Sequence, residues 1–179
     1  MSRRDKTPAS IMNKVDNTAL VIKEISDKLV AEYCKSLDDL MSVIREELQD
    51  NGEVTDIELE LHILDLANTL YFTGSAQEDL GIKEDTCKSI RQEIYNKTRE
   101  ESTGTVADKN ANAELVVTQE TIVLSIYSRA YKKVKLRMDA GYEMLNSLKK
   151  VMNKRISEME LSNSRYINIQ QERGSRRDG

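Results

Sequence analysis

The fold is decided by residues 123–161, VLSIYSRAYKKVKLRMDAGYEMLNSLKKVMNKRISEMEL. This stretch contains no proline, and its apolar side chains recur at steps of three, four and seven residues. Because successive helical residues are turned by about 100°, that spacing places them on one arc of an α-helix. The arc extends back to Val116. We therefore predict one uninterrupted helix over residues 106–161, about 80 Å long.

A first helix is predicted before Asn51-Gly52, the pair expected to end it. Its stripe of apolar and aromatic residues has helical spacing and consists of Ile22, Ile25, Leu29, Tyr33, Leu37, Leu40, Ile44 and Leu48. Residues 1–14 are polar and net basic, so we expect them to form a flexible arm.

Glycines are expected to separate the helices in the middle of the chain. The segment Thr55–Glu58 has the spacing of a capping box and predicts a helix over residues 56–72. Gly74 is expected to stop that helix. Gly81 is expected to separate a short turn from a further helix over residues 83–101.

The predicted fold is all-α, with three shorter helices plus one very long amphipathic helix in an elongated helical bundle. A single helical domain is expected over residues 15–161, with acidic helices in 15–101 and the basic helix in 106–161. The polar tail, residues 162–179, is expected to be disordered. The shorter helices cannot cover the whole apolar arc of a helix about 80 Å long. We therefore also expect a homo-oligomer.

Composition argues against membrane insertion, export and catalysis. No apolar run reaches the roughly 18 residues that span a bilayer, and the charged start leads into no signal-like segment. We therefore expect a cytoplasmic protein, in the host cytoplasm if phage-encoded, with reduced thiols at Cys34 and Cys87. His62 is the only histidine, and no nucleophile, phosphate loop or metal motif accompanies it. Neither an enzyme nor a cofactor or metal is expected.

Charge is segregated along the chain, although the formal net charge is only −4. Residues 35–101 hold 17 acidic and 7 basic residues, whereas residues 129–155 hold nine basic residues and two acidic ones. A basic stretch of this kind creates a local field that attracts phosphate or an acidic partner. Tyrosines share one flank with lysines, so bases could stack while phosphates meet ammonium groups. The candidate nucleic-acid-binding residues are Arg129, Tyr131, Lys132, Lys133, Lys135, Arg137, Tyr142, Lys149, Lys150, Lys154 and Arg155.

The same basic residues allow a structural interpretation. They could form a solvated helix face, or pair with the acidic helices of the same or a neighbouring subunit. Tyr127 points with the apolar arc and is predicted to be a core residue, whereas Tyr131 and Tyr142 lie at the edge of the arc and fit either interpretation.

A resemblance to a known family is carried by TGTVADK at 103–109, RAYKKVKLR at 129–137 and Leu148-Lys149-Lys150. Together they resemble phage UvsY-like recombination mediators over about residues 60–160. The resemblance implies a helical oligomer that binds single-stranded DNA and helps a recombinase displace a single-strand-binding protein. It places Lys132, Lys133, Lys135 and Arg137 on the DNA-contacting helix. The acidic balance and an N-terminal extension of about 50 residues depart from the family pattern.

Functions of different classes remain open at this stage. The first is a non-enzymatic nucleic-acid-binding accessory protein of recombination, with DNA favoured over RNA. The alternative is a coiled-coil structural or assembly protein of a phage, whose charges only select partners. A further alternative is an acidic adaptor or inhibitor of a host protein, in which residues 35–101 mimic nucleic acid.

Overall fold

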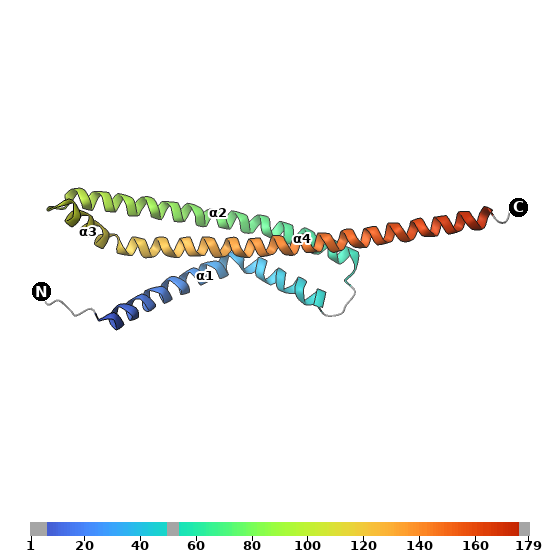
Figure 1. Cartoon of the computed structure of the whole chain (residues 1–179), viewed down its shortest axis with the longest axis horizontal. Coiled ribbons are helices and arrows are strands. Elements are labelled where there is room, and N and C mark those ends of the chain that lie inside the picture. Colours follow the sequence, from blue (N-terminus) through green and yellow to red (C-terminus); the bar gives the residue numbers. More distant parts are fainter. Residues whose placement is uncertain (1–6, 50–53, 176–179) are drawn as a thin grey trace.

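The computed structural model describes residues 7–49 and 54–175, with side chains described up to Arg165. These residues form four helices, α1 (Pro8–Gln49), α2 (Asp56–Glu101), α3 (Val106–Val116) and α4 (Thr118–Ser175). No described residue belongs to a strand, so the all-α prediction is confirmed. In Figure 1 the molecule is elongated, with α2 running antiparallel to α4 and α1 running in the same direction as α4.

The core lies where α1, α2 and α4 meet. Leu37, Leu66 and Val134, one from each helix, are fully buried in the same apolar cluster. Gly141 of α4 packs tightly against both other helices, because a Cβ atom there would lie 2.8 Å from Leu70 Cδ2 and 3.3 Å from Leu37 Cδ1. Only a glycine lets the three helices come this close without displacing a buried leucine.

The predicted breaks at Gly74 and Gly81 are wrong, because α2 runs without interruption from Asp56 to Glu101. Its buried face continues across Gly74, from Leu70 to Leu80, which directly precedes Gly81. A Cβ atom at Gly74 would lie 3.6 Å from Met138, and one at Gly81 would lie 3.5 Å from Tyr131. Both glycines therefore face α4 inside a continuous helix. The packing against α4 outweighs the roughly 1 kcal/mol by which a glycine weakens a helix interior.

The predicted uninterrupted helix over residues 106–161 is also wrong, because it is divided at Val117. Val117 has φ −84° and ψ 16° and is fully buried. The Thr118 hydroxyl donates to the carbonyl oxygen of Leu115 at 2.9 Å, which satisfies a carbonyl at the break. The short helix α3 instead packs on the end of α2, where Arg91 pairs with Glu114 at 2.8 Å. Buried packing at Val117 thus turns the chain.

The predicted capping box at Thr55–Glu58 is confirmed at the start of α2. Thr55 Oγ1 accepts a hydrogen bond from the Glu58 amide at 3.3 Å, and the Glu58 carboxylate accepts one from the Thr55 amide at 2.8 Å. Thr105 and Asp108 form the same arrangement at the start of α3. These hydrogen bonds to Thr55 and Thr105 hold the pKa values of the Glu58 and Asp108 carboxyl groups below their ordinary values.

Both outer helices are longer than predicted. The first helix begins at Pro8, so residues 8–14 of the expected flexible arm are helical. Proline suits this position because it lacks only an amide proton that would be unpaired in a first turn. Helix α4 continues to Ser175, past the expected end at residue 161, so the expected disorder of residues 162–175 is corrected to a helix. Asn51-Gly52, the expected end of the first helix, lies outside the described residues.

The middle of the apolar arc of α4 is covered from within the chain. Ala130, Val134, Leu145 and Leu148 belong to the core that α4 forms with α1 and α2. Val123, Ile156 and Met159 of the same arc are 43–55 % exposed, so the shorter helices leave part of the arc uncovered, and the homo-oligomer stays a prediction. The C-terminal part of α4 extends past the other helices (Figure 1). Leu161 is 60 % exposed, and Met159 lines a hollow that it shares with the start of α2.

Candidate nucleic-acid interface

Two of the candidate basic residues connect α4 to α1. Lys133 Nζ donates to Asp27 Oδ1 at 2.5 Å and to the buried Ser26 Oγ at 3.2 Å. Arg137 pairs with Asp38 at 2.6 Å. The hydrogen bond from Lys133 is the main reason that the pKa of Asp27 lies below its ordinary value. These two residues therefore have structural partners within the chain.

Arg155 and Lys154 are also engaged. The Arg155 guanidinium donates to Asp56 Oδ1 at 2.9 Å and to the Val54 carbonyl oxygen at 2.7 Å, which connects α4 to the start of α2. Lys154 lies 3.7 Å from Glu158 one turn along α4. An exposed pair of this kind contributes little, about 0.3–0.5 kcal/mol on a helix, so Lys154 stays available to another anion.

The remaining five candidate basic residues are exposed and have no ion pair among the described residues: Arg129, Lys132, Lys135, Lys149 and Lys150. Lys132 and Lys150 lie on the side of α4 opposite its buried arc, and Lys135 and Lys149 lie toward the flank that carries Tyr142. The structure thus divides the nine basic residues into an inner set of three that fastens the bundle, Lys154, which pairs within α4, and an outer set of five that faces solvent.

The tyrosines divide in the same way. Tyr127 packs partly buried against the core cluster, as predicted. Tyr131 also packs against this cluster and faces Gly81 of α2, so its ring is engaged in the fold. Tyr142 is 46 % exposed and lines a shallow hollow that it shares with Tyr71, Glu78 and Asp79 of α2.

The hollow at Tyr142 was not predicted from the sequence. Tyr71 is 72 % exposed there, and an aromatic pair that flanks a hollow could accept a base. Glu78 and Asp79 line the same hollow and would repel a phosphate at that point. Any strand that stacks on Tyr142 must therefore direct its phosphates away from α2, toward the outer lysines of α4.

Polar groups elsewhere serve packing. His62 Nε2 lies 2.6 Å from Glu47 Oε2 and connects α2 to α1. Cys34 and Cys87 are both free thiols. Burial raises the pKa of the Cys34 thiol to about 11, so it is held in its unreactive protonated form.

Comparison of the chain with family models, with curated proteins and with solved structures gave no match. The likeness to recombination mediators therefore rests on the residues quoted above. Within residues 7–49 and 54–175, no helix combines the length and the apolar character that crossing a membrane requires.

Proposed function

We propose that this protein is a non-enzymatic nucleic-acid-binding accessory protein and that the outer face of α4 contacts the phosphates of a single strand. The observation that supports this proposal is the outer set of basic residues, which is exposed and unpaired in the described part of the chain while neighbouring arginines and lysines are fixed in ion pairs. Cationic side chains without a protein partner can each neutralise a phosphate and release its counterion.

The spacing of the outer lysines suits an extended strand. Lys132 and Lys135 form one cationic group and Lys149 and Lys150 form another, about 20 Å further along the helix. Tyr142 lies between the two groups and offers a ring on which a base can stack. We therefore propose a contact over several nucleotides that does not depend on base sequence. A role in loading a recombinase is proposed on the resemblance to recombination mediators alone.

The test of phosphate contact is a variant in which Lys132, Lys135, Lys149 and Lys150 are all replaced by Gln. This variant leaves every described ion pair between helices in place, so the fold should survive. Binding to a single-stranded oligonucleotide, measured by fluorescence anisotropy across a salt series, should weaken. The slope of log affinity against log salt should fall by about 0.7 per lost contact.

The matched control replaces Lys28, Lys35, Lys97 and Arg99 with Gln, which removes the same charge from exposed residues of α1 and α2. The control should retain the affinity and salt slope of the parent. A parent that does not bind single strands, or a control that loses as much affinity as the α4 variant, would refute the proposal.

Stacking is tested separately at Tyr142. Tyr142→Ala should weaken binding by about 1–3 kcal/mol and leave the salt slope unchanged, because stacking releases no counterions. Tyr142→Phe keeps the ring and should bind as the parent does. If both variants bind equally well, Tyr142 does not stack on a base.

A second candidate function is that of an assembly protein, and one observation favours it. The exposed face of α2 carries large apolar side chains, among them Ile57 at 72 % and Phe72 at 64 % exposure. Several such residues on one helix face indicate a protein–protein contact. The two candidates are separated by the oligonucleotide titration, because an assembly protein would show no binding that depends on the outer lysines.

A further inference from the structure

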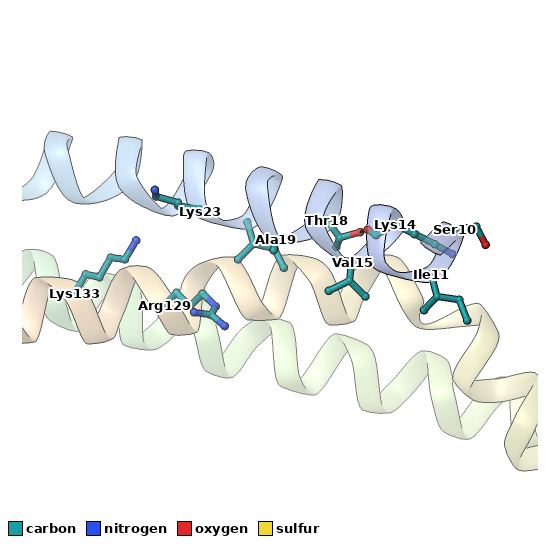
Figure 2. Close-up of a pocket in the computed structure, with 10 residues that line it drawn as sticks. Ser10, Ile11, Lys14, Val15, Thr18, Ala19, Lys23, Arg129 and Lys133 are labelled. Atoms are coloured by element: carbon teal, nitrogen blue, oxygen red, sulfur yellow. Dashed lines mark hydrogen bonds between the residues drawn. The ribbon is translucent and has the colours of Figure 1, made fainter. Parts of the chain in front are cut away.

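The N-terminal half of α1 leaves an open groove beside α4. The stripe of α1 that is buried from Val30 to Ile44 continues toward the N-terminus through Ile22, Ala19, Val15 and Ile11. There α1 diverges from α4, and Ile11 and Val15 point from α1 toward the gap (Figure 2). The groove has a volume of about 930 Å³, and Val15 on its wall is 60 % exposed.

The groove is cationic as well as apolar. Four of its ten lining residues are basic, and none is acidic: Lys14, Lys23, Arg129 and Lys133. Of these, only Lys133 has an ion-pair partner among the described residues. An occupant that fits both properties is a helix with an apolar stripe and acidic flanks, since helix-in-groove contacts combine apolar anchors with charge complementarity at the rim.

Such a stripe exists on α2 of the same chain. Its residues are 53–72 % exposed, namely Ile57, Leu61, Leu64, Tyr71 and Phe72. They lie opposite the face that α2 buries through Leu59 and Leu66. Helix α2 thus has two apolar faces, of which only one is covered in the described structure.

Acidic residues border this α2 stripe on both sides. On a helical wheel Glu60 lies along one edge and Asp65 along the other, and Glu78 lies in line with Glu60, about 9 Å past Phe72. None of the three forms an ion pair in the described part of the chain. The stripe spans residues 57–72, about 23 Å of helix, and the groove spans residues 10–23 of α1, about 20 Å. The two surfaces therefore match in polarity, charge and length.

We propose that the groove between α1 and α4 of one copy binds the α2 stripe of a second copy of this chain. The groove lies near the start of α4 and the stripe lies near the start of α2, at opposite ends of the elongated bundle (Figure 1). An intramolecular contact between them is therefore excluded by distance. The groove and the stripe are different surfaces of the same chain, so each copy offers both halves of the contact to its neighbours. Arg129 then belongs to this contact, and so does Tyr71 at the edge of the Tyr142 hollow, while the outer lysines remain free for nucleic acid.

The test is a pair of charge reversals that can rescue each other. The groove variant carries Lys14→Glu, Lys23→Glu and Arg129→Glu, and the stripe variant carries Glu60→Lys, Asp65→Lys and Glu78→Lys. Each variant places like charges at the contact, so sedimentation velocity should show the parent as a complex at micromolar concentration and each variant alone as a monomer. An equimolar mixture should restore a complex, because the reversed groove meets the reversed stripe.

The matched control carries Lys28→Glu, Lys35→Glu and Lys97→Glu, which makes the same change in charge as the groove variant on exposed residues outside the groove. It should associate as the parent does, and circular dichroism should show all variants to be equally helical. The proposal would be overturned if the parent is monomeric at about 100 µM, a concentration on the order of the Kd of a weak interface. Association that persists in both variants, or a mixture that stays monomeric, would overturn it as well. None of these outcomes bears on the outer lysines, so nucleic-acid binding is judged separately.

Discussion

The two halves of α1 carry the same kind of apolar stripe but differ in how far that stripe is buried. Leu37 and Ile44 in the second half are fully buried, whereas Val15 in the first half is 60 % exposed. The second half is fastened to α4 by the Lys133–Asp27 and Arg137–Asp38 pairs. Before Asp27, no ion pair in the described residues connects α1 to another helix. Apolar periodicity thus identifies the apolar face of a helix. Contacts between residues far apart in the sequence decide whether another helix of the same chain buries that face.

The largest expected contrast is between Leu37→Ala and Val15→Ala. Leu37 is fully buried in the three-helix core, so its truncation should lower the free energy of unfolding by about 2–5 kcal/mol. Val15→Ala should change it by no more than about 0.5 kcal/mol at a concentration where the protein is monomeric. Urea denaturation measures both. A comparable loss in the two variants would mean that α1 closes onto α4 in solution and that the groove is not open.

The next contrast is between two glycines at helix contacts. Gly141→Ala places a Cβ atom 2.8 Å from Leu70 Cδ2 and 3.3 Å from Leu37 Cδ1, and both leucines are buried. Overpacking should cost about 1–3 kcal/mol, offset by about 1 kcal/mol of improved helix propensity, so the variant should be less stable by up to about 2 kcal/mol.

Gly74→Ala is the matched control, because its Cβ atom would lie at an ordinary contact distance of 3.6 Å from Met138. This variant should gain about 0.5–1 kcal/mol from helix propensity alone. Thermal melts should therefore shift in opposite directions. A gain in stability for both variants would show that the packing around Gly141 can accommodate a Cβ atom.

The fold could be predicted where short-range chemistry decides it. The starts of α2 and α3 follow from Thr55 and Thr105, each of which exchanges hydrogen bonds with a residue three positions later. The glycines of α2 and the break at Val117 could not be predicted in this way. Packing against α4 keeps α2 continuous at Gly74, and burial at Val117 divides a pattern whose spacing alone predicts one helix.

The candidate site was predictable as a region and not as a set of residues. The basic character of α4 is evident in the sequence, because its lysines and arginines lie close together along the chain. Which of them are occupied depends on partners far away, since Asp27 precedes Lys133 by 106 residues and Asp38 precedes Arg137 by 99. The Tyr71–Tyr142 hollow likewise depends on the packing of α2 on α4, which no spacing within one helix reveals.

A smaller effect is expected where α1 is fastened to α4. Arg137→Gln removes the pair with Asp38, in which the arginine side chain is 54 % exposed. An exposed pair contributes about 0.2–1 kcal/mol and is screened by salt. The loss of stability should therefore be measurable at low ionic strength and should shrink at 1 M salt, where screening acts within about 3 Å. A loss that does not depend on salt would show that Arg137 acts through packing of its aliphatic stem.

The smallest expected effect concerns Lys133, at the boundary between the closed and open halves of α1. Its hydrogen bond lowers the pKa of Asp27 in the folded state, so the pair contributes stability above the unfolded pKa of Asp27 and loses it as the pH falls through the folded value. Lys133→Gln should therefore be less stable than the parent at pH 7. The difference should shrink as the pH falls below the ordinary aspartate value of 3.8 and vanish below the lowered pKa of Asp27 in the folded state. Lys132→Gln, which removes an exposed lysine without a described ion pair, serves as the control and should show no such pH-dependent difference. Urea titrations of the three proteins at several pH values test this. A difference between parent and Lys133→Gln that persists unchanged in acid would mean that the hydrogen bond from Lys133 to the buried Ser26 hydroxyl, at 3.2 Å, is what fastens α1 at this point.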